Sequence, residues 1–332
     1  MICRLRYLAS PMVTAALIIA ACESTHESSS TPEVLASDTR ETVPEIEGQV
    51  GFRIDGEPVC VSNLPTVEMR TAVPPRVEAG RWRSLGPGVD YTTLTTSTSP
   101  SSSDATFHVV RVAPEMARLR LLSVTVEGGE ARTAGAWCDE EHLLAAINAG
   151  MYQSDLVTHT GYLRIGASVN SDSWTKRYNS LLLLDPARPG LAPATLVDLD
   201  DPGSRKLSLS YATVAQNLRL IRGNGRSTWN NNPRSWSEAL IAEDRHGRIL
   251  LLFSRTPFSM ADLNRRLLSS PLEIVRAMHA EGGPEASLSV RADGLSLDLA
   301  GSFETGFNEN DDNRQQWPLP NVLGVTAREN HR

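Results

Sequence analysis

Short stretches in which apolar and polar residues alternate recur along the chain, and turn-forming residues separate each one from the next. Alternation with a period of two places successive side chains on opposite faces of a strand, so these stretches predict β-strands. From Trp82 onward the pattern predicts strands at residues 107–113, 119–126, 179–185, 213–221, 238–244, 248–254 and 286–292. The proline-framed stretch 317–325 predicts a final strand.

Three stretches carry a pattern typical of helices, at residues 138–147, 259–269 and 271–280. The first has acids in its opening turn, and the second begins with Ser259 as a predicted N-cap. Because many strands are interrupted by few helices, we expect an α+β fold. Its core would be a mixed, largely antiparallel β-sheet with a few flanking helices.

The composition changes sharply along the chain and predicts its organisation. The main domain is expected at 82–327, with a short tail at 328–332. Residues 46–81 hold two strand-like pieces and are expected to form an N-terminal arm. Residues 22–45 are acidic, rich in Ser and Thr and poor in large apolar residues, so they cannot bury enough surface to offset the entropy of ordering. We expect this stretch to be a disordered tether.

Residues 1–21 have the pattern of a secretory signal peptide, in which basic residues precede an apolar run too short to span a bilayer permanently. An isoleucine and two alanines precede Cys22, which resembles the lipobox of bacterial lipoproteins. The resemblance implies that Cys22 is lipidated and that the protein lies in the bacterial cell envelope. Because Glu23 follows the cysteine, it implies the outer membrane. The alternative is an ordinary secreted protein cleaved nearby.

The net charge of −7 says little about partners, because much of it lies in the tether. No basic cluster with interleaved aromatic residues is present, which argues against nucleic-acid binding. After the leader is removed and Cys22 is acylated, Cys60 and Cys138 form an even pair in an oxidising compartment, and we expect them to form a disulfide. Two cysteines without a CxxC motif or paired histidines do not predict a metal site, and we expect no metal and no cofactor.

Two stretches carry amides in unusual places. "AAINAGMY" (145–152) passes through Asn148 and Gly150 to Tyr152, where a small-residue turn would let the backbone approach a ligand. The alternative is a simple helix C-cap. "ATVAQNLRLIRGNGR" (212–226) carries Gln216 and Asn217 inside an apolar strand, where buried amides need hydrogen-bond partners. They would either line a pocket or be satisfied within the sheet.

"RAMHAEGGPEASL" (276–288) is the most informative stretch. If the preceding residues are helical, Glu281 arrives at the negative end of a helix, where a glutamate is unfavourable. Gly282 and Gly283 would reverse the chain and present Glu281 and Glu285 at a sheet edge. The alternative is a pair of solvated turn residues. Further on, "GSFETGFNENDDN" (301–313) would be either a ligand-binding loop or an exposed acidic one.

In this order, these stretches resemble the phosphodiester glycosidase family over residues 82–327. Residues 148–152 match an Asn-Gly-Gly-x-aromatic turn, 216–221 match a strand that contains Gln and ends in Leu-Ile, and 281–283 match an Asp-Gly-Gly turn. The chain departs from the family in three places, and these departures resemble a bacterial lipoprotein branch. Glu281 replaces the aspartate, His279 and Ala280 replace Asn-Leu, and Ser237 or Glu238 stands where an arginine is usual.

The resemblance implies hydrolysis of the bond between a sugar anomeric carbon and a phosphodiester. The leaving group is a phosphomonoester with a second pKa of about 6, so it departs readily. The site needs a carboxylate near the developing oxocarbenium ion and donors for the phosphate. The resemblance assigns Glu281 as that carboxylate and Glu238 or Glu285 as a second acid or base. The implied substrate-binding residues are Asn148, Gly150, Tyr152, Gln216, Asn217, Arg219, Arg234, His279, Gly282 and Gly283.

Two other functions are alternatives to a phosphodiester glycosidase. A carbohydrate-binding or envelope-scaffold lipoprotein would keep the glycan pocket and lose the chemistry. A serine hydrolase is less well supported, because no G-x-S-x-G motif is present. No H-E-x-x-H motif indicates a zinc enzyme. The expected partner is therefore a glycan or glycosyl-phosphate substrate, with membrane contact through the lipid alone.

Overall fold

A computed structural model describes residues 53–54, 57–58, 76–97 and 105–328. The chain divides into two units, Met1–Met69 and Arg70–Arg332. In the first unit, β1 (Arg53–Ile54) pairs with β2 (Glu57–Pro58) in an antiparallel ribbon. The leader, the tether, Cys22 and Cys60 lie outside the described residues, so lipidation and the disulfide stay predictions. Within the described ranges, no helix is long and apolar enough to cross a membrane.

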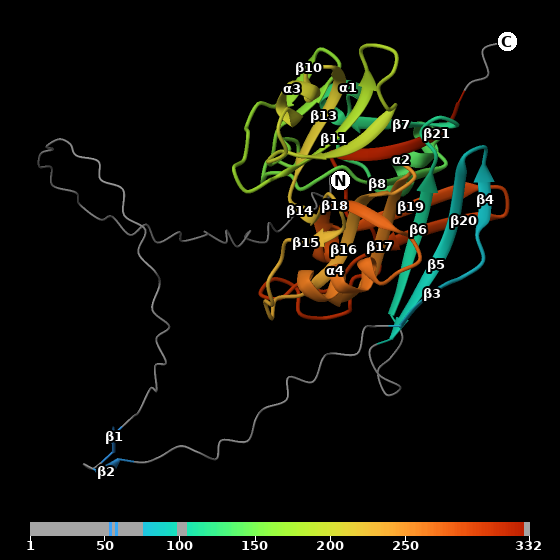
Figure 1. Cartoon of the computed structure of the whole chain (residues 1–332). Coiled ribbons are helices and arrows are strands. Elements are labelled where there is room, and N and C mark those ends of the chain that lie inside the picture. The colour runs from blue at the N-terminus through green and yellow to red at the C-terminus, as the bar shows by residue number, and fades with distance from the viewer. Residues whose placement is uncertain (1–52, 55–56, 59–75, 98–104, 329–332) are drawn as a thin grey trace, which may run out of the picture. The chain divides into compact units, whose positions relative to one another are not determined.

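The second unit is built from one nine-stranded and two five-stranded sheets (Figure 1). The nine-stranded sheet contains β3 (Arg76–Ala79), β4 (Arg83–Gly86), β5 (Val89–Ser97), β6 (Ala105–Val112), β14 (Arg219–Arg222), β15 (Arg226–Ser227), β16 (Trp236–Asp244), β17 (Ile249–Phe258) and β18 (Ile274–Gly282). The first five-stranded sheet has the order β10 (Ser168–Ser171), β9 (Leu163–Ile165), β13 (Tyr211–Asn217), β11 (Ser180–Pro186) and β12 (Ala194–Asp198). The other has the order β20 (Leu295–Ala300), β19 (Ser287–Ala292), β8 (Ala145–Asn148), β21 (Asn321–Ala327) and β7 (Ala117–Ser123).

The sheets dominate the fold more than the expected α+β class implies. Strands account for 49% of the structure and helices for 11%. All strand pairs in the described ranges are antiparallel, as expected for most of them. The few short helices are α1 (Val124–Glu127), α2 (Ala134–Glu140), α3 (Ser204–Ser208), α4 (Met260–Leu268) and the 3-10 turn η1 (Gly283–Glu285).

The helix predictions had mixed outcomes. The helix at 259–269 is confirmed as α4, because Ser259 caps it and its side chain accepts a hydrogen bond from the Asp262 amide. The helix at 138–147 is wrong: α2 ends at Glu140, and β8 begins at Ala145. All four residues of β8 are buried between β19 and β21, so an apolar run that is typical of a buried strand was mistaken for a helix.

The predicted helix at 271–280 is also wrong, because this stretch forms β18, between β14 and β16. Its side chains alternate between two apolar clusters. Met278 and Ala280 join the cluster between the sheets, whereas Ile274 and Ala277 join the cluster beneath α4. A strand covered on both faces is apolar almost throughout and does not show clear alternation. Glu281 is therefore the penultimate residue of a strand, so no helix dipole acts on it.

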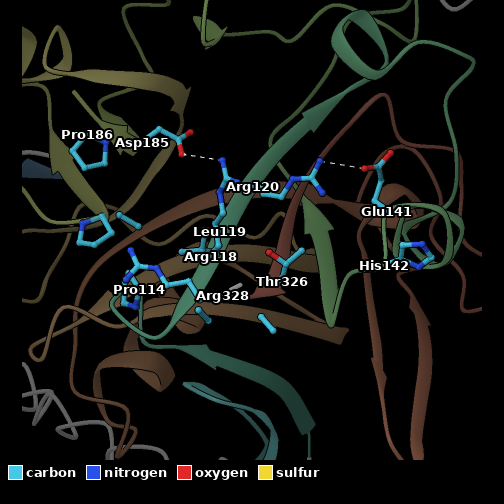
Figure 2. A pocket seen from close by; sticks show the side chains of 14 residues that line it. Pro114, Arg118, Leu119, Arg120, Glu141, His142, Asp185, Pro186, Thr326 and Arg328 are labelled. Atoms are coloured by element: carbon cyan, nitrogen blue, oxygen red, sulfur yellow. Dashed lines mark hydrogen bonds and ion pairs between the residues drawn. The ribbon is translucent and has the colours of Figure 1, made fainter. Parts of the chain in front are cut away.

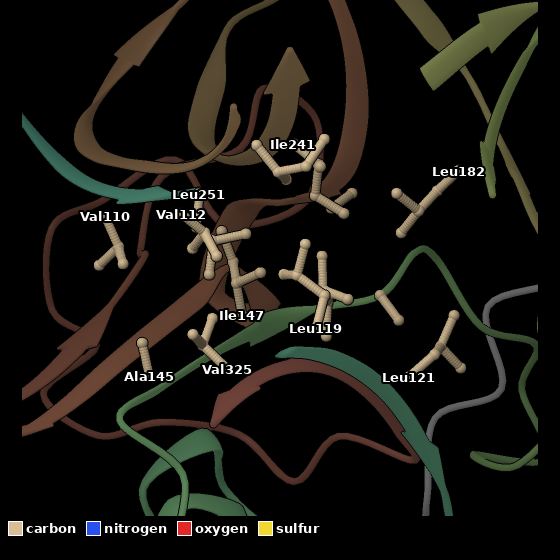
Figure 3. Packing of buried hydrophobic residues seen from close by; sticks show 14 of the residues in the cluster. Val110, Val112, Leu119, Leu121, Ala145, Ile147, Leu182, Ile241, Leu251 and Val325 are labelled. Carbon is tan, nitrogen blue, oxygen red and sulfur yellow. The ribbon is translucent and has the colours of Figure 1, made fainter. Parts of the chain in front are cut away.

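The main core lies where the three sheets meet (Figure 3). On β17, Ile249, Leu251 and Phe253 point into this core, while Leu250 and Leu252 pack in the cluster that includes α4. Because successive side chains of a strand point to opposite faces, β17 contributes side chains to both clusters. The core holds the ends of β8, β16 and β18 in fixed register, which positions the polar residues that follow them.

Candidate functional site

The end of β18 brings two glutamates together. Glu281 is the penultimate residue of β18, and η1 then carries the chain through Gly283 to Glu285 before β19 begins. Gly283 has a φ of 64°, and a Cβ there would lie 2.5 Å from an Oε2 atom of Glu304, so this turn requires glycine. The sequence "EGGPE" thereby places Glu281 and Glu285 at one turn, and Glu304 from the loop 301–313 lies beside Gly283.

These carboxyl groups lie in an environment that favours their protonated forms. Burial, opposed by the charge of His279 and assisted by the nearby Glu285 carboxylate, raises the pKa of Glu281 to about 8. Burial raises the pKa of Glu285 to about 7, and Glu304 adds to the effect. Burial, followed by the charges of Glu281 and Glu285, also raises the pKa of Tyr152. Mutually perturbed carboxyls of this kind are frequent at active sites.

A buried pair on β16 and β18 lies beside these glutamates. The Oε1 atom of Glu238 is 2.7 Å from Nδ1 of His279, and the Nε1–H of Trp236 donates to Oε2 of Glu238 at 2.7 Å. Glu238 is fully buried, and His279 is 4% exposed. Antiparallel pairing of β16 with β18, with an irregularity next to Ala239, brings the two side chains together.

Glu304, which the sequence analysis does not assign to the site, belongs to the same cluster. It lies in the loop 301–313, and the acidic composition of this loop is the only sign of it in the sequence. The backbone of Glu304 forms an isolated antiparallel β-bridge with that of Trp236. Burial raises its pKa, while Arg234 and His279 lower it. Arg234 itself is exposed and donates to the carbonyl of Thr305 at 3.4 Å. The structure thus places Arg234 at the edge of the cluster.

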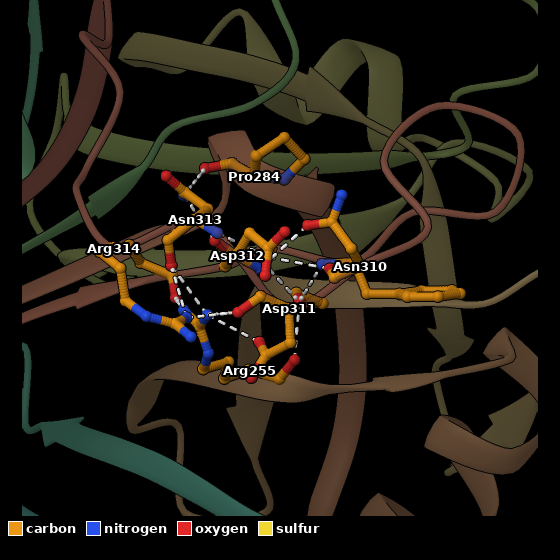
Figure 4. A network of polar contacts seen from close by, with 12 residues as sticks. Arg255, Pro284, Asn310, Asp311, Asp312, Asn313 and Arg314 are labelled. Atoms are coloured by element: carbon orange, nitrogen blue, oxygen red, sulfur yellow. Dashed lines mark hydrogen bonds and ion pairs between the residues drawn. The ribbon is translucent and has the colours of Figure 1, made fainter.

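A polar network holds this loop in place (Figure 4). Arg255 donates to the carbonyl of Ala300 at 2.7 Å and to that of Asn313 at 2.8 Å, and its guanidinium lies 2.6 Å from the Asp311 carboxylate. Asn313 in turn donates to the carbonyls of Gly301 and Pro284. The loop is therefore fastened both to β17 and to η1, close to Glu285.

Asn148 and Asn217 organise the backbone around the cluster. Asn148 is 1% exposed, donates to the carbonyl of Glu285 at 3.0 Å and accepts from the amide of Ser287 at 2.8 Å. Asn217 donates to the carbonyl of Ala149 at 2.8 Å. Gly150 lies beside Asn217, where a larger residue would collide, because a Cβ at position 150 would lie 2.2 Å from the Asn217 Oδ1 atom. Both amides are engaged in holding adjacent strands.

Gln216 and Arg219 have other partners. The amide of Gln216 donates to the carbonyls of Thr175 and Tyr178 and accepts from the amide of Tyr162, so it is satisfied within the fold. Arg219 pairs with Asp198 at 3.3 Å and with Asp200 at 2.6 Å. The sequence-predicted residues that surround the turn are therefore Tyr152, Arg234, Glu238, His279, Glu281, Gly282, Gly283 and Glu285, with Asn148 beneath them. Their roles stay predictions.

A large cavity lies away from this cluster. It has a volume of about 1230 Å³ and is lined by β7, β21 and the β11–β12 region (Figure 2). Arg118 and Arg120 face it, paired with Asp185 at 3.7 Å and Glu141 at 3.2 Å respectively. None of the candidate site residues lines it. We place the candidate site by its chemistry, at the turn where Glu281, Glu285 and Glu304 lie together with His279.

Comparisons with known proteins identify the family to which the chain is similar. The family model described as phosphodiester glycosidase matches residues 141–326, which contain the whole cluster. The catalytic domain of zebrafish N-acetylglucosamine-1-phosphodiester alpha-N-acetylglucosaminidase, auto-inhibited by its pro-peptide, is 12% identical with a TM-score of 0.54, covering 77% of this chain and 89% of that one. A hypothetical protein from Synechocystis is 14% identical with a TM-score of 0.49, covering 73% and 62%. No curated protein matches significantly.

Proposed function

The chain belongs to the phosphodiester glycosidase family, and on that premise we propose that it hydrolyses the sugar-phosphate bond of a glycosyl-1-phosphodiester. The observation that carries the proposal is the convergence of Glu281, Glu285 and Glu304 with His279 around one glycine turn. The solved relative named for this activity shares the fold. The proposed substrate is a glycan of the cell envelope or the extracellular space.

The different pKa values of the two central glutamates suggest different roles. Burial raises the pKa of Glu281 to about 8 and that of Glu285 to about 7, so Glu285 is the more readily ionised of the two near neutral pH. Two carboxyls in contrasting protonation states can serve as acid and base. Glu285, in place of the Glu281 that the resemblance assigns to this role, would be the carboxylate at the anomeric carbon, acting as nucleophile or as base for water. Glu281 would donate a proton to the bridging oxygen as the C1–O bond breaks. The phosphomonoester then leaves.

The test is hydrolysis of N-acetyl-α-D-glucosaminyl 1-(methyl phosphate) in water enriched in ¹⁸O. A glycosidase breaks the C1–O bond, so ¹⁸O appears in free N-acetylglucosamine, and ³¹P NMR shows unlabelled methyl phosphate. Cleavage of a P–O bond instead would place ¹⁸O in the phosphate and refute a glycosidase mechanism. Binding without turnover would contradict hydrolysis and support the carbohydrate-binding alternative.

Variants of the two glutamates test the assignment. Glu281→Gln and Glu285→Gln should each lower kcat by about 10²–10⁴-fold, the usual contribution of acid or base catalysis. Glu130→Gln is a matched control, because Glu130 is exposed and lies outside the cluster. Unchanged kcat in both cluster variants would remove these residues from the mechanism.

We also propose that the mature protein is anchored to the bacterial envelope through lipidated Cys22. The support is the apolar run at 12–21 followed by the lipobox-like residues before this cysteine. Metabolic labelling with a tagged fatty acid should mark the wild-type protein and leave Cys22→Ala unlabelled. Equal labelling of the two proteins would argue against the anchor.

A further inference from the structure

His279 and Glu238 form a buried ion pair whose geometry leaves one end of the imidazole free for a ligand. Both oxygens of the Glu238 carboxylate are engaged, one by Nδ1 of His279 and the other by the indole of Trp236, each at 2.7 Å. Because Glu238 is fully buried, it offers no surface to a substrate. Its contacts instead fix the orientation of the His279 ring, as a carboxylate orients a catalytic or metal-binding histidine elsewhere.

The opposite ring nitrogen of His279, Nε2, is not used by Glu238. Among the described residues, His279 forms an ion pair with Glu238 alone, and Nε2 has no hydrogen-bond partner. The ring nevertheless feels the charges of Glu281 and Glu304. Nε2 is therefore available as a donor on a ring that lies within the charge environment of Glu281 and Glu304.

The charges around the ring favour its cationic form. Burial alone lowers the pKa of His279, but the Glu238 carboxylate from β16 raises it, and Glu281 from β18 itself and Glu304 from the loop 301–313 raise it to the extent that they are ionised. Trp236 also lies next to His279. Its ring is uncharged, and the two ring centroids are 6.2 Å apart. The only other cation that acts on this cluster in the described structure is the exposed Arg234. His279 is thus the buried positive charge of the cluster.

We propose that the imidazolium of His279 binds the phosphate group of the ligand through Nε2, and that Glu238 is a positioning residue that keeps this ring oriented and protonated. The choice of a phosphate follows from its chemistry. An anionic oxygen accepts a charge-assisted hydrogen bond from a buried cation, whereas a sugar hydroxyl gains much less from the charge. The identity of the phosphate group rests on the proposed function, while the state of the histidine does not.

The first experiment follows the imidazole of His279 by long-range ¹H–¹⁵N NMR in the full-length protein, with its signal assigned through His279→Gln. In the wild type we expect Nδ1 to be protonated and the pKa to lie above 6.5, the ordinary value. N-acetylglucosamine 1-phosphate should shift the Nε2 resonance and raise this pKa further, and N-acetylglucosamine alone should not. A neutral ring with Nδ1 unprotonated at pH 6, or no response to N-acetylglucosamine 1-phosphate or inorganic phosphate, would overturn the proposal.

The second experiment separates positioning from structure. Glu238→Gln keeps the size of the side chain and removes its charge, so the pKa of His279 should fall below 6.5. Affinity for N-acetylglucosamine 1-phosphate at pH 7 should then weaken about tenfold, as expected for the loss of one charged hydrogen bond. Affinity for N-acetylglucosamine should change by less than about twofold. A general loss of folding would instead weaken both ligands alike, and the wild-type titration would still decide the proposal.

A matched control is available in the exposed pair of His246 and Glu273, whose atoms Nε2 and Oε2 lie 3.2 Å apart. Glu273→Gln should change neither the pKa of His279 nor phosphate binding. The two proposals can fail separately. Turnover of a diester without any response of His279 would refute this inference alone, while a phosphate response without turnover would refute only the hydrolase function.

Discussion

Replacing Glu281 by Gln should make the protein more stable at alkaline pH. Burial raises the pKa of Glu281 to about 8 in the folded protein, against an ordinary value of 4.5. Folding therefore favours the protonated carboxyl, and the resulting stability is fully present below pH 4.5 and is lost as the pH rises to about 8. Glutamine has nearly the shape of the protonated acid and cannot ionise, so the variant escapes this loss.

The magnitude follows from the pKa difference. The full shift corresponds to an upper bound of about 5 kcal/mol in the free energy of unfolding. Because Glu281 retains some exposure, solvent screening reduces this to about 2–3 kcal/mol. For a domain of this size we expect the Tm of Glu281→Gln to exceed that of wild type by about 5–10 °C at pH 9.

The assay is thermal unfolding of wild type, Glu281→Gln and the exposed control Glu130→Gln between pH 5 and pH 9. The difference between wild type and Glu281→Gln should be small at pH 5 and should grow steadily above it, while the control follows wild type. A Glu281→Gln protein that is less stable than wild type at pH 9, or a difference independent of pH, would refute the reasoning. Such a gain in stability with a loss of activity is typical of residues retained for function.

Three further predictions concern the same region. If Glu285 and Glu281 act as base and acid, kcat/KM should fall below about pH 7 and above about pH 8, which a pH–rate profile measures; a flat profile over this range would exclude the pair. Asn148→Ala should lower the free energy of unfolding by about 2–4 kcal/mol in urea denaturation, because two buried backbone groups lose their partner. Gly150→Ala should lower the free energy of unfolding by about 2–4 kcal/mol, because the added Cβ would collide with the Asn217 side chain. Gly166→Ala should lower it by about 1 kcal/mol, because Gly166 has a φ of 59° but open space around it. Equal costs for the two glycines would refute the contact argument.

The sequence predicted the strands better than the helices for a physical reason. Strands such as β6 and β11 stand at the predicted positions, because alternating or continuous apolar runs between turn residues are typical of sheets. The helix α4 was predictable because Ser259 marks its start locally. By contrast, β8 and β18 are covered on both faces, and periodicity alone does not distinguish such strands from buried helices. Whether other elements cover both faces of a segment depends on the whole fold and not on the local sequence.

The candidate site was partly predictable for a similar reason. The two glycines and the proline at 281–285 predict a turn, and the sequence shows directly that glutamates begin and end it. The contact between Glu238 and His279 depends on the register between β16 and β18, including its irregularity, which no local pattern specifies. Gln216 looked like a pocket residue because it is polar in an apolar strand, yet backbone groups of a neighbouring loop satisfy it.

The protonation of the cluster bears on how it could accept an anionic substrate. Four ionised glutamates would repel a phosphodiester, and the structure reduces that repulsion in two ways. Burial raises the pKa of Glu281 to about 8 and that of Glu285 to about 7, so fewer negative charges are present near neutral pH. The charge of Glu238 is matched by the proton on His279. A phosphate that enters such a site meets a cation and carboxyl groups able to donate hydrogen bonds, and it raises their pKa values further by its own charge. Binding should therefore take up protons, and isothermal titration of N-acetylglucosamine 1-phosphate in buffers of different ionisation enthalpy would measure this uptake directly. Release of protons on binding would contradict this account of the site.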